Sequence, residues 1–144
     1  MRRVKGIIGG KAEAVLTVGA DDSAFEALSR MAEHDVGALV VLDGDQLAGI
    51  ISERDCARKV ALLEKDLRAT KVREVMTAEV LCVEAEQPVE KAMKIMIQNH
   101  VRHLPVTRGR RVVGVVSMRD AVREVVSEQR FVISELETYI TRRI

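Results

Sequence analysis

The sequence predicts an α/β (α+β) fold in which two β-α-β-β-α repeats pack as a pseudo-twofold pair, followed by a C-terminal helical extension. The first observation behind this prediction is the heptapeptide Gly49–Asp55, whose pattern returns 65 positions later in Gly114–Asp120. The second is that 46 residues around each copy align without a gap, with 16 identities. Two copies without a third exclude a solenoid and favour halves that bury each other's apolar faces.

The first copy shows the repeat unit. Its first helix is expected to begin at Ser23, with Glu26 placed to complete a capping box, and a turn containing Gly44 joins two strands. Apolar residues recur at helical spacing after Ser23, while β-rich runs elsewhere end at polar residues. The predicted strands are residues 14–18, 37–42 and 47–51, and the closing helix runs from about Ser52 to Leu63.

The second copy follows the same order. Pro88 is expected in the first turn of a helix, where a missing amide costs nothing. A strand is predicted at 80–83, a turn at 108–111 joins two more strands, and the last helix begins near Ser117. The predicted segments are a lead-in at 1–13, the first repeat at 14–63, a linker at 64–77, the second repeat at 78–126 and the helical extension at 127–144.

An apolar stripe continues along the C-terminal helix, which has a second capping-box pattern at Ser134–Glu137 where it could restart. The stripe extends beyond the core of the second repeat. We therefore expect it to pack against a second subunit and the protein to be a homodimer. The stripe consists of Val122, Val125, Val126, Val132, Ile133, Leu136 and Ile140.

Composition restricts the functional classes. The chain has 23 basic and 22 acidic side chains, a net charge of +1 and only 2% aromatic residues, which argues against nucleic-acid binding by stacked bases in a basic groove. It has no polybasic patch and no apolar stretch long enough for a signal peptide or a membrane span. We therefore expect a cytoplasmic protein that binds neither nucleic acid nor membrane.

Residues typical of catalysis or metal binding are few. Cys56 and Cys82 lack the spacing of a disulfide framework. His100 and His103 are three residues apart but have no third ligand nearby, and His34 is placed to interact with the end of a helix. No nucleophile can be paired with a base from its spacing. We predict that the protein is not an enzyme and holds no metal and no catalytic cofactor.

The repeated Ser-x-x-Asp motif allows two interpretations. As a helix cap, its serine satisfies an orphan amide and its aspartate favours the positive end of the helix dipole. As a ligand site, the strand-to-helix turn attracts phosphate, the carboxylate accepts the hydroxyls of a ribose, and the arginine before it neutralises phosphate charge. Repetition of the serine, the arginine and the aspartate together favours the ligand site.

At this point the chain resembles a tandem pair of cystathionine β-synthase (CBS) domains, the Bateman module. The resemblance rests on the duplicated β-α-β-β-α unit, on the Gly-x-x-Ser-x-x-Asp motif of each copy and on residues 102–106. It covers roughly residues 14–126, and Leu136–Ile140 resembles the end of small stand-alone bacterial members. The resemblance implies clefts between the repeats that bind adenosine nucleotides: AMP, ADP, ATP, sometimes NAD or S-adenosylmethionine.

The resemblance also implies roles for single residues. The aspartates would take the ribose hydroxyls, the serines would lie close to ribose or phosphate, and the arginines would reach phosphates. These residues are Asp55, Ser52 and Arg54 in the first copy and Asp120, Ser117 and Arg119 in the second. The adenine would lie against residues entering two strands of each copy: Val15, Leu16, Thr17, Val36, Gly37, Ala38, Val80, Leu81, Cys82, Val101, Arg102, His103, Leu104 and Pro105.

The two copies differ beside the motif. Residues 36–38 are small and neutral, whereas residues 101–103 include an arginine and a histidine. A polyphosphate or NAD would prefer the second cleft if those side chains face it, so we expect the Asp120 cleft to be at least as well occupied as that of Asp55. Pro105 lacks an amide and is expected at an unpaired edge of its sheet.

The sequence thus predicts a regulatory module that binds an adenine nucleotide as a sensor of energy or redox state. It would act through a homodimer or through a regulated protein that the sequence does not identify. A structural scaffold remains the alternative: its aspartates would only cap helices, and its C-terminal stripe would bind another protein.

Overall fold

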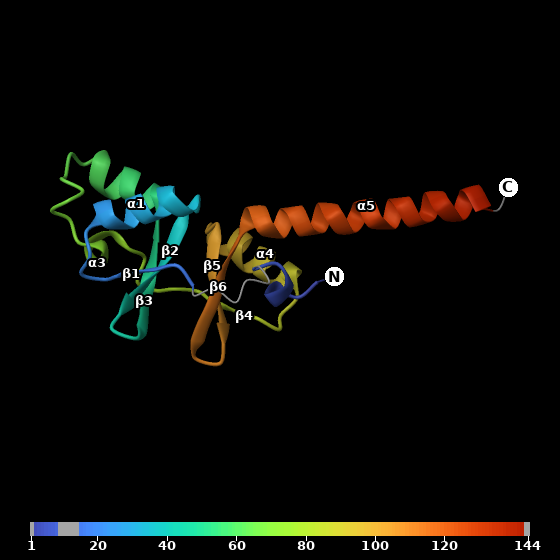
Figure 1. The fold of residues 1–144 in the computed structure, drawn as a ribbon, viewed down its shortest axis with the longest axis horizontal. Coiled ribbons are helices and arrows are strands. Elements are labelled where there is room, and N and C mark those ends of the chain that lie inside the picture. The colour runs from blue at the N-terminus through green and yellow to red at the C-terminus, as the bar shows by residue number, and fades with distance from the viewer. Residues whose placement is uncertain (1, 9–14, 143–144) are drawn as a thin grey trace.

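The fold consists of two three-stranded sheets that lie next to each other and carry helices on their outer faces, with one long helix leaving the body (Figure 1). The computed structural model describes residues 2–8 and 15–142. Each half contains the elements β-α-β-β-α in the predicted order, which confirms the fold class.

The first long helix and the two hairpin strands have the same lengths in the two halves. The first repeat contains β1 (Thr17–Gly19), α1 (Ala24–His34), β2 (Ala38–Asp43), β3 (Gln46–Ser52) and α2 (Glu53–Cys56), which continues as the π-helical turn η2 (Ala57–Ala61). The second contains β4 (Val83–Glu84), α4 (Val89–Asn99), β5 (His103–Arg108), β6 (Arg111–Ser117) and α5 (Met118–Arg142). The short helices η1 (Val4–Gly6) and α3 (Val72–Val75) lie outside the two repeats in sequence.

Both sheets have the same topology. The central strand, β2 or β5, pairs in parallel with the short first strand and antiparallel with the third. The motif glycines occupy equivalent register positions, with Gly49 opposite Val41 and Gly114 opposite Val106. Gly44 in the first hairpin turn has a φ of 64°, a conformation that glycine adopts without a steric penalty.

Several local expectations require correction. The first strands are shorter and begin later than expected, because parallel pairing starts only at Thr17 and Val83. Pro88 is the N-cap of α4 and precedes its first turn. The C-terminal helix does not restart at Ser134, since α5 is continuous from 118 to 142. Ser23 accepts from the Glu26 amide at 3.0 Å, whereas the Glu26 carboxylate pairs with Arg30, so only half of the capping box forms.

Pro105 was expected at an unpaired edge of its sheet, and this expectation is wrong. It belongs to β5, the central strand of its sheet, opposite Val115. The short β4 pairs with β5 only from Val106 onward. The side of Pro105 toward β4 therefore lies outside that pairing, which removes the need for an amide there.

Residues 71–77, within the segment expected as a linker, complete the first core. Val72 and Val75 in α3 are almost completely buried among the apolar residues of the first repeat. The Val72 amide donates to the carbonyl of Asp22 at 2.8 Å, and the Arg73 amide donates to the carbonyl of Ala20 at 2.9 Å. This segment therefore belongs structurally to the repeat that precedes it.

Residues 2–8 complete the second core in the same way. Val4 is fully buried in the apolar cluster of the second repeat. Its amide donates to the carbonyl of Gln87 at 2.8 Å, and the Lys5 amide donates to the carbonyl of Ala85 at 2.9 Å. Because Gln87 and Ala85 are equivalent to Asp22 and Ala20, the N-terminal segment does for the second repeat what residues 71–77 do for the first.

The glycine of each motif lies where these segments cross the third strand. A Cβ atom on Gly49 would lie 2.6 Å from the backbone oxygen of Thr77, and one on Gly114 would lie 2.9 Å from Cδ1 of Ile8. Both separations are shorter than a non-bonded contact allows. Glycine at this motif position therefore permits the close crossing.

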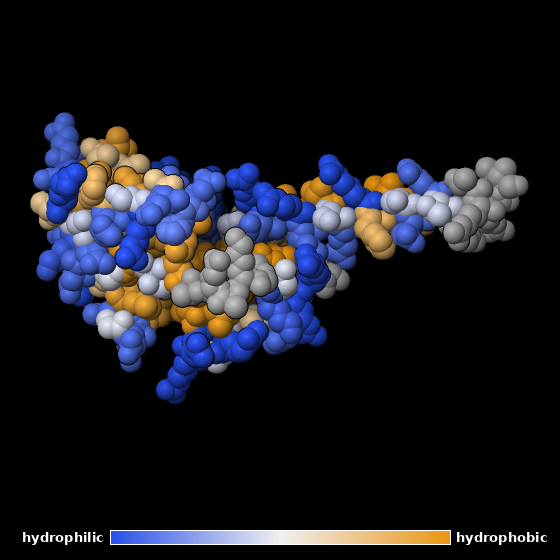
Figure 2. All heavy atoms as spheres, in the orientation of Figure 1, coloured by the Kyte–Doolittle hydropathy of each residue, from blue (hydrophilic) through white to orange (hydrophobic). Residues whose placement is uncertain are grey.

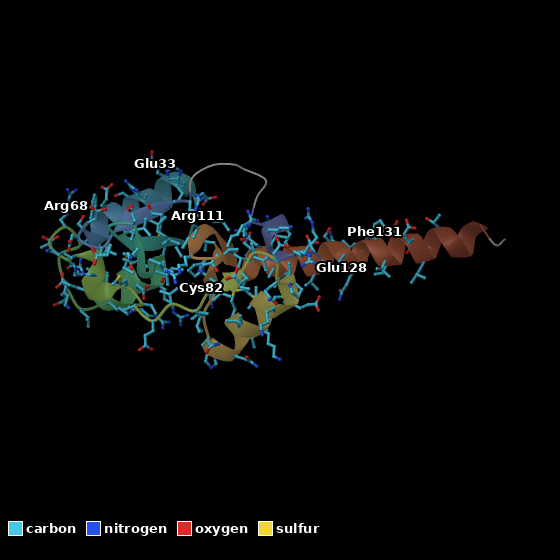
Figure 3. All side chains as sticks on the ribbon, turned by 90° about the horizontal axis from the view of Figure 1, so that it is seen from below. Glu33, Arg68, Cys82, Arg111, Glu128 and Phe131 are labelled. Atoms are coloured by element: carbon cyan, nitrogen blue, oxygen red, sulfur yellow. The ribbon has the colours of Figure 1, made fainter. Side chains whose placement is uncertain are left out.

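The helix α5 has 25 residues and a length of about 38 Å. Its first turns pack against the second repeat, and the rest projects away from the body (Figure 1). Apolar patches follow the projecting part in Figure 2, and Phe131 lies there in Figure 3. The exposed large apolar residues of α5 with described side chains are Val122, Val126, Phe131, Val132, Ile133 and Leu136.

Candidate functional site

The two repeats enclose a cavity of about 940 Å³ at their junction. This volume is in the usual range for pockets that bind small molecules. Its walls come from the end of α1, the starts of β2 and α2, the start of β5, the end of β6 and the first turns of α5. The lining residues are Met31, Ala32, Asp35, Val36, Gly37, Ala38, Glu53, Arg102, His103, Val115, Ser117, Met118, Arg119, Asp120 and Arg123.

Ser117 and Asp120 form a reciprocal helix cap in this cavity. The Asp120 amide donates to Oγ of Ser117 at 3.0 Å, and the Ser117 amide donates to Oδ2 of Asp120 at 3.1 Å. Within the described residues, Oδ1 of Asp120 makes no hydrogen bond or ion pair. The cap therefore leaves one carboxylate oxygen available to a ligand.

Three arginines of the second repeat line the same cavity: Arg102, Arg119 and Arg123. None of them forms an ion pair with another described residue. Arg119 and Arg123 are one helical turn apart on α5 and so lie on the same side of it. A guanidinium can donate two parallel hydrogen bonds to a phosphate, so these side chains can bind an anionic group.

Arg123 was not among the residues predicted from the motif. Two signals in the sequence could have identified it. It lies four residues after Arg119 on the same helix, and it is one of the identities between the copies, since it is equivalent to Arg58.

Gly37 and His103 bring the two repeats into contact beside the cavity. A Cβ atom on Gly37 would lie 3.4 Å from Nε2 of His103 and 3.3 Å from Oε1 of Glu53. Burial is the main cause that lowers the pKa of His103, while the carboxylate of Asp120 acts in the opposite direction. A neutral imidazole therefore faces the carboxylate at the wall of the cavity.

Residues 36–38 line the same cavity as Arg102, His103 and Asp120. From the sequence, residues 36–38 and 101–103 are expected to line separate clefts. In the structure, the starts of β2 and β5 contribute to one wall because the two sheets meet there. The small residues of the first repeat thus lie beside His103 and line the same cavity as the arginines of the second.

The motif of the first repeat has the same cap, but of its residues 52–55 only Glu53 lines this cavity. The Asp55 amide donates to Oγ of Ser52 at 3.1 Å, and the Ser52 amide donates to Oδ2 of Asp55 at 2.9 Å. The Asp55 side chain is 14% exposed and pairs with Lys59 at 3.0 Å. Arg54 follows Ser52 in α2 and is exposed.

The other residues expected around an adenine do not line the cavity. Leu104 and Pro105 are buried within the second sheet, and Val101 precedes it. Cys82, labelled in Figure 3, lies in the stretch that enters β4. The members of the two strand-entry groups are Val15, Leu16, Thr17, Val80, Leu81 and Cys82, of which only Leu81 is exposed.

Neither thiol has the properties of a nucleophile. Burial, aided by the neighbouring carboxylates of Asp55 and Glu53, raises the pKa of Cys56 to about 11. Burial also raises the pKa of Cys82, with Glu84 as a second cause. Both side chains are therefore protonated thiols at neutral pH.

Two further properties concern metals and membranes. Within residues 2–8 and 15–142, no group of three or more His, Cys, Asp or Glu side chains is arranged to hold a metal ion. Among the helices described, none combines the length and the apolar composition needed to cross a bilayer.

The profile of the CBS domain family matches residues 11–62 and 72–127, which together make up most of the sequence. The chain belongs to the CBS domain family. It is 42% identical over 125 residues to the mitochondrial CBS domain-containing protein CBSX3 of Arabidopsis thaliana, covering 83% of this chain and 61% of that protein. This CBS pair thus spans less than two thirds of the Arabidopsis relative.

Solved structures show the same fold. A protein with CBS domains from Burkholderia ambifaria MC40-6 has a TM-score of 0.83 and 41% identity, covering 89% of this chain and 96% of its own. The CBS domain pair of protein MJ0100 has a TM-score of 0.77 and 27% identity, covering 88% and 98%. That pair was solved in complex with 5′-methylthioadenosine and S-adenosyl-L-methionine.

Proposed function

We propose that this CBS domain pair is a regulatory module that binds an adenine nucleotide in the cavity containing Asp120 and senses the energy or redox state of the cell. AMP, ADP, ATP and NAD are the candidate ligands. The observation that carries the proposal is the set of groups in one cavity: a carboxylate with an available oxygen, a serine hydroxyl and three arginines without acidic partners among the described residues.

Each group suits one part of a nucleotide. Oδ1 of Asp120 would accept from the ribose hydroxyls, as acidic residues do in dinucleotide folds. Arg102, Arg119 and Arg123 would hold phosphates. The small residues 36–38 leave room for a flat base beside His103. The adenosine compounds bound to the MJ0100 pair support the adenosine part of this assignment.

The helix α5 would transmit the bound state. Its first turn carries Arg119 and Asp120, while its projecting part carries exposed apolar residues such as Ile133 and Leu136. We propose that this stripe pairs two copies of the chain. A ligand that tilts the start of α5 would then change the arrangement of the dimer, or the surface presented to a regulated protein.

Thermal unfolding with each of the four nucleotides at millimolar concentration tests the proposal. At least one of them should raise the Tm, because ligand at 100 times its Kd adds about 2.7 kcal/mol of stability. Asp120→Asn should lower the affinity of the protein for that nucleotide at least tenfold, since the amide no longer offers two acceptor oxygens. Asp45→Asn, in the exposed β2–β3 turn, is the matched control and should bind like the wild type.

A scaffold without a nucleotide role is the second candidate. It is supported by the caps that Asp55 and Asp120 form, which explain both aspartates without any ligand. On this hypothesis none of the four nucleotides shifts the Tm. Asp120→Asn then lowers the free energy of unfolding only by the amount typical of a lost helix cap, about 1 kcal/mol. That pair of results would refute the regulatory proposal.

The cytoplasmic location stays a prediction from the sequence. The Arabidopsis relative is described as mitochondrial.

A further inference from the structure

The two motifs of the repeat are equivalent in sequence but differ in what surrounds their aspartates. Asp55 and Asp120 both use Oδ2 to accept from the amide of the motif serine. The difference lies in the second oxygen and in the serine hydroxyl. This difference bears on how many nucleotides one chain binds. The inference drawn from it rests on the function proposed above.

In the first repeat, Lys59 occupies the free side of the carboxylate. Its Nζ lies 3.0 Å from Oδ1 of Asp55 and also donates to the carbonyl of Val75 at 3.0 Å. Val75 belongs to α3, which is anchored in the first core. The ammonium group of Lys59 is therefore held by two partners, and its position does not depend on a single exposed ion pair.

The serine of the first repeat is engaged as well. Oγ of Ser52 donates to Oδ2 of Asp55 at 3.1 Å while it accepts from the Asp55 amide. In the second repeat, Oγ of Ser117 accepts from the Asp120 amide and makes no described bond to the Asp120 carboxylate. Of the two motif serines, only Ser117 therefore has a hydroxyl proton that is not donated to a described residue.

In the second repeat, a carboxylate takes the place of the lysine. Glu124 is the residue equivalent to Lys59, and it cannot form an ion pair with Asp120. Its carboxylate instead pairs with Arg2 at 3.1 Å and is 13% exposed. Arg2, from the N-terminal segment, thus holds this acidic side chain in an ion pair of its own.

We infer that the chain binds one nucleotide, at Asp120, and that Lys59 closes the equivalent acceptor at Asp55. A ribose needs carboxylate oxygens that can accept from its two hydroxyls. Those of Asp55 are already paired with an ammonium group, an amide and a hydroxyl, whereas one oxygen of Asp120 has no described partner. Lysine at position 59 occupies the acceptor at Asp55, whereas glutamate at the equivalent position 124 leaves Oδ1 of Asp120 without a cation.

Isothermal titration calorimetry with AMP, ADP, ATP and NAD in turn tests the inference. The wild type should bind one equivalent per chain, and Lys59→Met should bind two. Lys65→Met is the matched control, because Lys65 is exposed away from the motif and should leave the stoichiometry at one. Adding Asp55→Asn to Lys59→Met should return it to one, which assigns the new site to Asp55.

The reverse change gives an independent test. Glu124→Lys places a cation four residues after Asp120, where it can pair with Oδ1 as Lys59 does with Asp55. Its affinity for the nucleotide should fall at least tenfold, with the folded state checked by circular dichroism.

The possible failures are distinguishable. Two equivalents bound by the wild type, or one bound by folded Lys59→Met, would overturn the role of Lys59 and leave the regulatory proposal standing. No binding of any of the four nucleotides by the wild type would overturn the proposed function itself.

Discussion

The carboxylate of Asp120 has two oxygens, and the described protein uses only one of them. Oδ2 caps α5 through the Ser117 amide, while Oδ1 has no partner among the described residues, and Asp120 lines the cavity at the junction of the repeats. Capping and ligand binding are therefore compatible functions of the same side chain. A cap also fixes the rotamer of the aspartate, so a ligand would meet an acceptor that is already oriented.

His103 should make the stability of the protein depend on pH. Burial lowers the pKa of His103 from the ordinary 6.5. The carboxylates of Asp120 and Glu53 act to raise this pKa, whereas the charge of Arg102 lowers it further. The unfolded chain therefore binds the proton of this imidazole more tightly than the folded one. The contribution of His103 to stability is fully present above pH 6.5 and is lost as the pH falls toward the folded pKa. The free energy of unfolding in urea, measured at pH 7.5 and 5.5, should be lower at pH 5.5.

The variant His103→Gln isolates this contribution. It should show a smaller decrease between the two pH values than the wild type, because the buried imidazole is gone. His34→Gln, at the exposed end of α1, controls for the loss of an imidazole elsewhere. An unchanged pH dependence in His103→Gln would show that other groups produce it.

At the scale of the elements, the motif glycine should be needed for stability rather than for ligand binding. Gly49→Ala would place a Cβ atom 2.6 Å from the oxygen of Thr77, a backbone atom that cannot move without shifting residues 71–77. We expect a loss of about 1–3 kcal/mol in the free energy of unfolding, measured in urea. Gly6→Ala is the control, since the nearest atom there is the flexible Arg2 Nε at 3.6 Å.

At the scale of the whole molecule, the projecting part of α5 should hold two copies together. Ile133 and Leu136 are 55% and 56% exposed, which is unusual for side chains of this size on a helix without a partner. Ile133→Asp combined with Leu136→Asp should convert a dimer into a monomer in sedimentation velocity. Ser134→Asp combined with Thr138→Asp adds the same charge on the other side of the helix and should leave the dimer intact. A monomeric wild type would contradict this prediction.

The architecture was predictable because the repeat carries it twice. Helix and strand signals that are weak in one copy gain support when they return at the same spacing, and Asp120 with Ser117 was identified as a candidate site in this way. Clefts between the repeats were expected, but the set of residues that shares one cavity was not predictable, since it depends on how two sheets meet. Residues 36–38 and 101–103 were therefore assigned to different clefts, although residues 36–38 line the same cavity as Arg102 and His103.

Other features were missed for related physical reasons. The pairing of Lys59 with Asp55 is a matter of side-chain geometry that a four-residue spacing permits but does not require. Pro105 was expected on an edge strand, because the sequence does not reveal that β4 is too short to flank it. The packing of residues 2–8 on the second repeat depends on contacts between distant parts of the chain, which local patterns do not report.

The packing of the N-terminal segment on the second repeat fixes the order in which the two cores can be completed. During synthesis the first repeat has every part of its core once α3 has left the ribosome, whereas Val4 must wait for strands made much later. Contacts between such distant residues form slowly, because a long loop must close first. A boundary drawn between the repeats would leave the second core open, so the second half depends on the N-terminal segment to finish folding, whereas the first half has its whole core in residues 15–77.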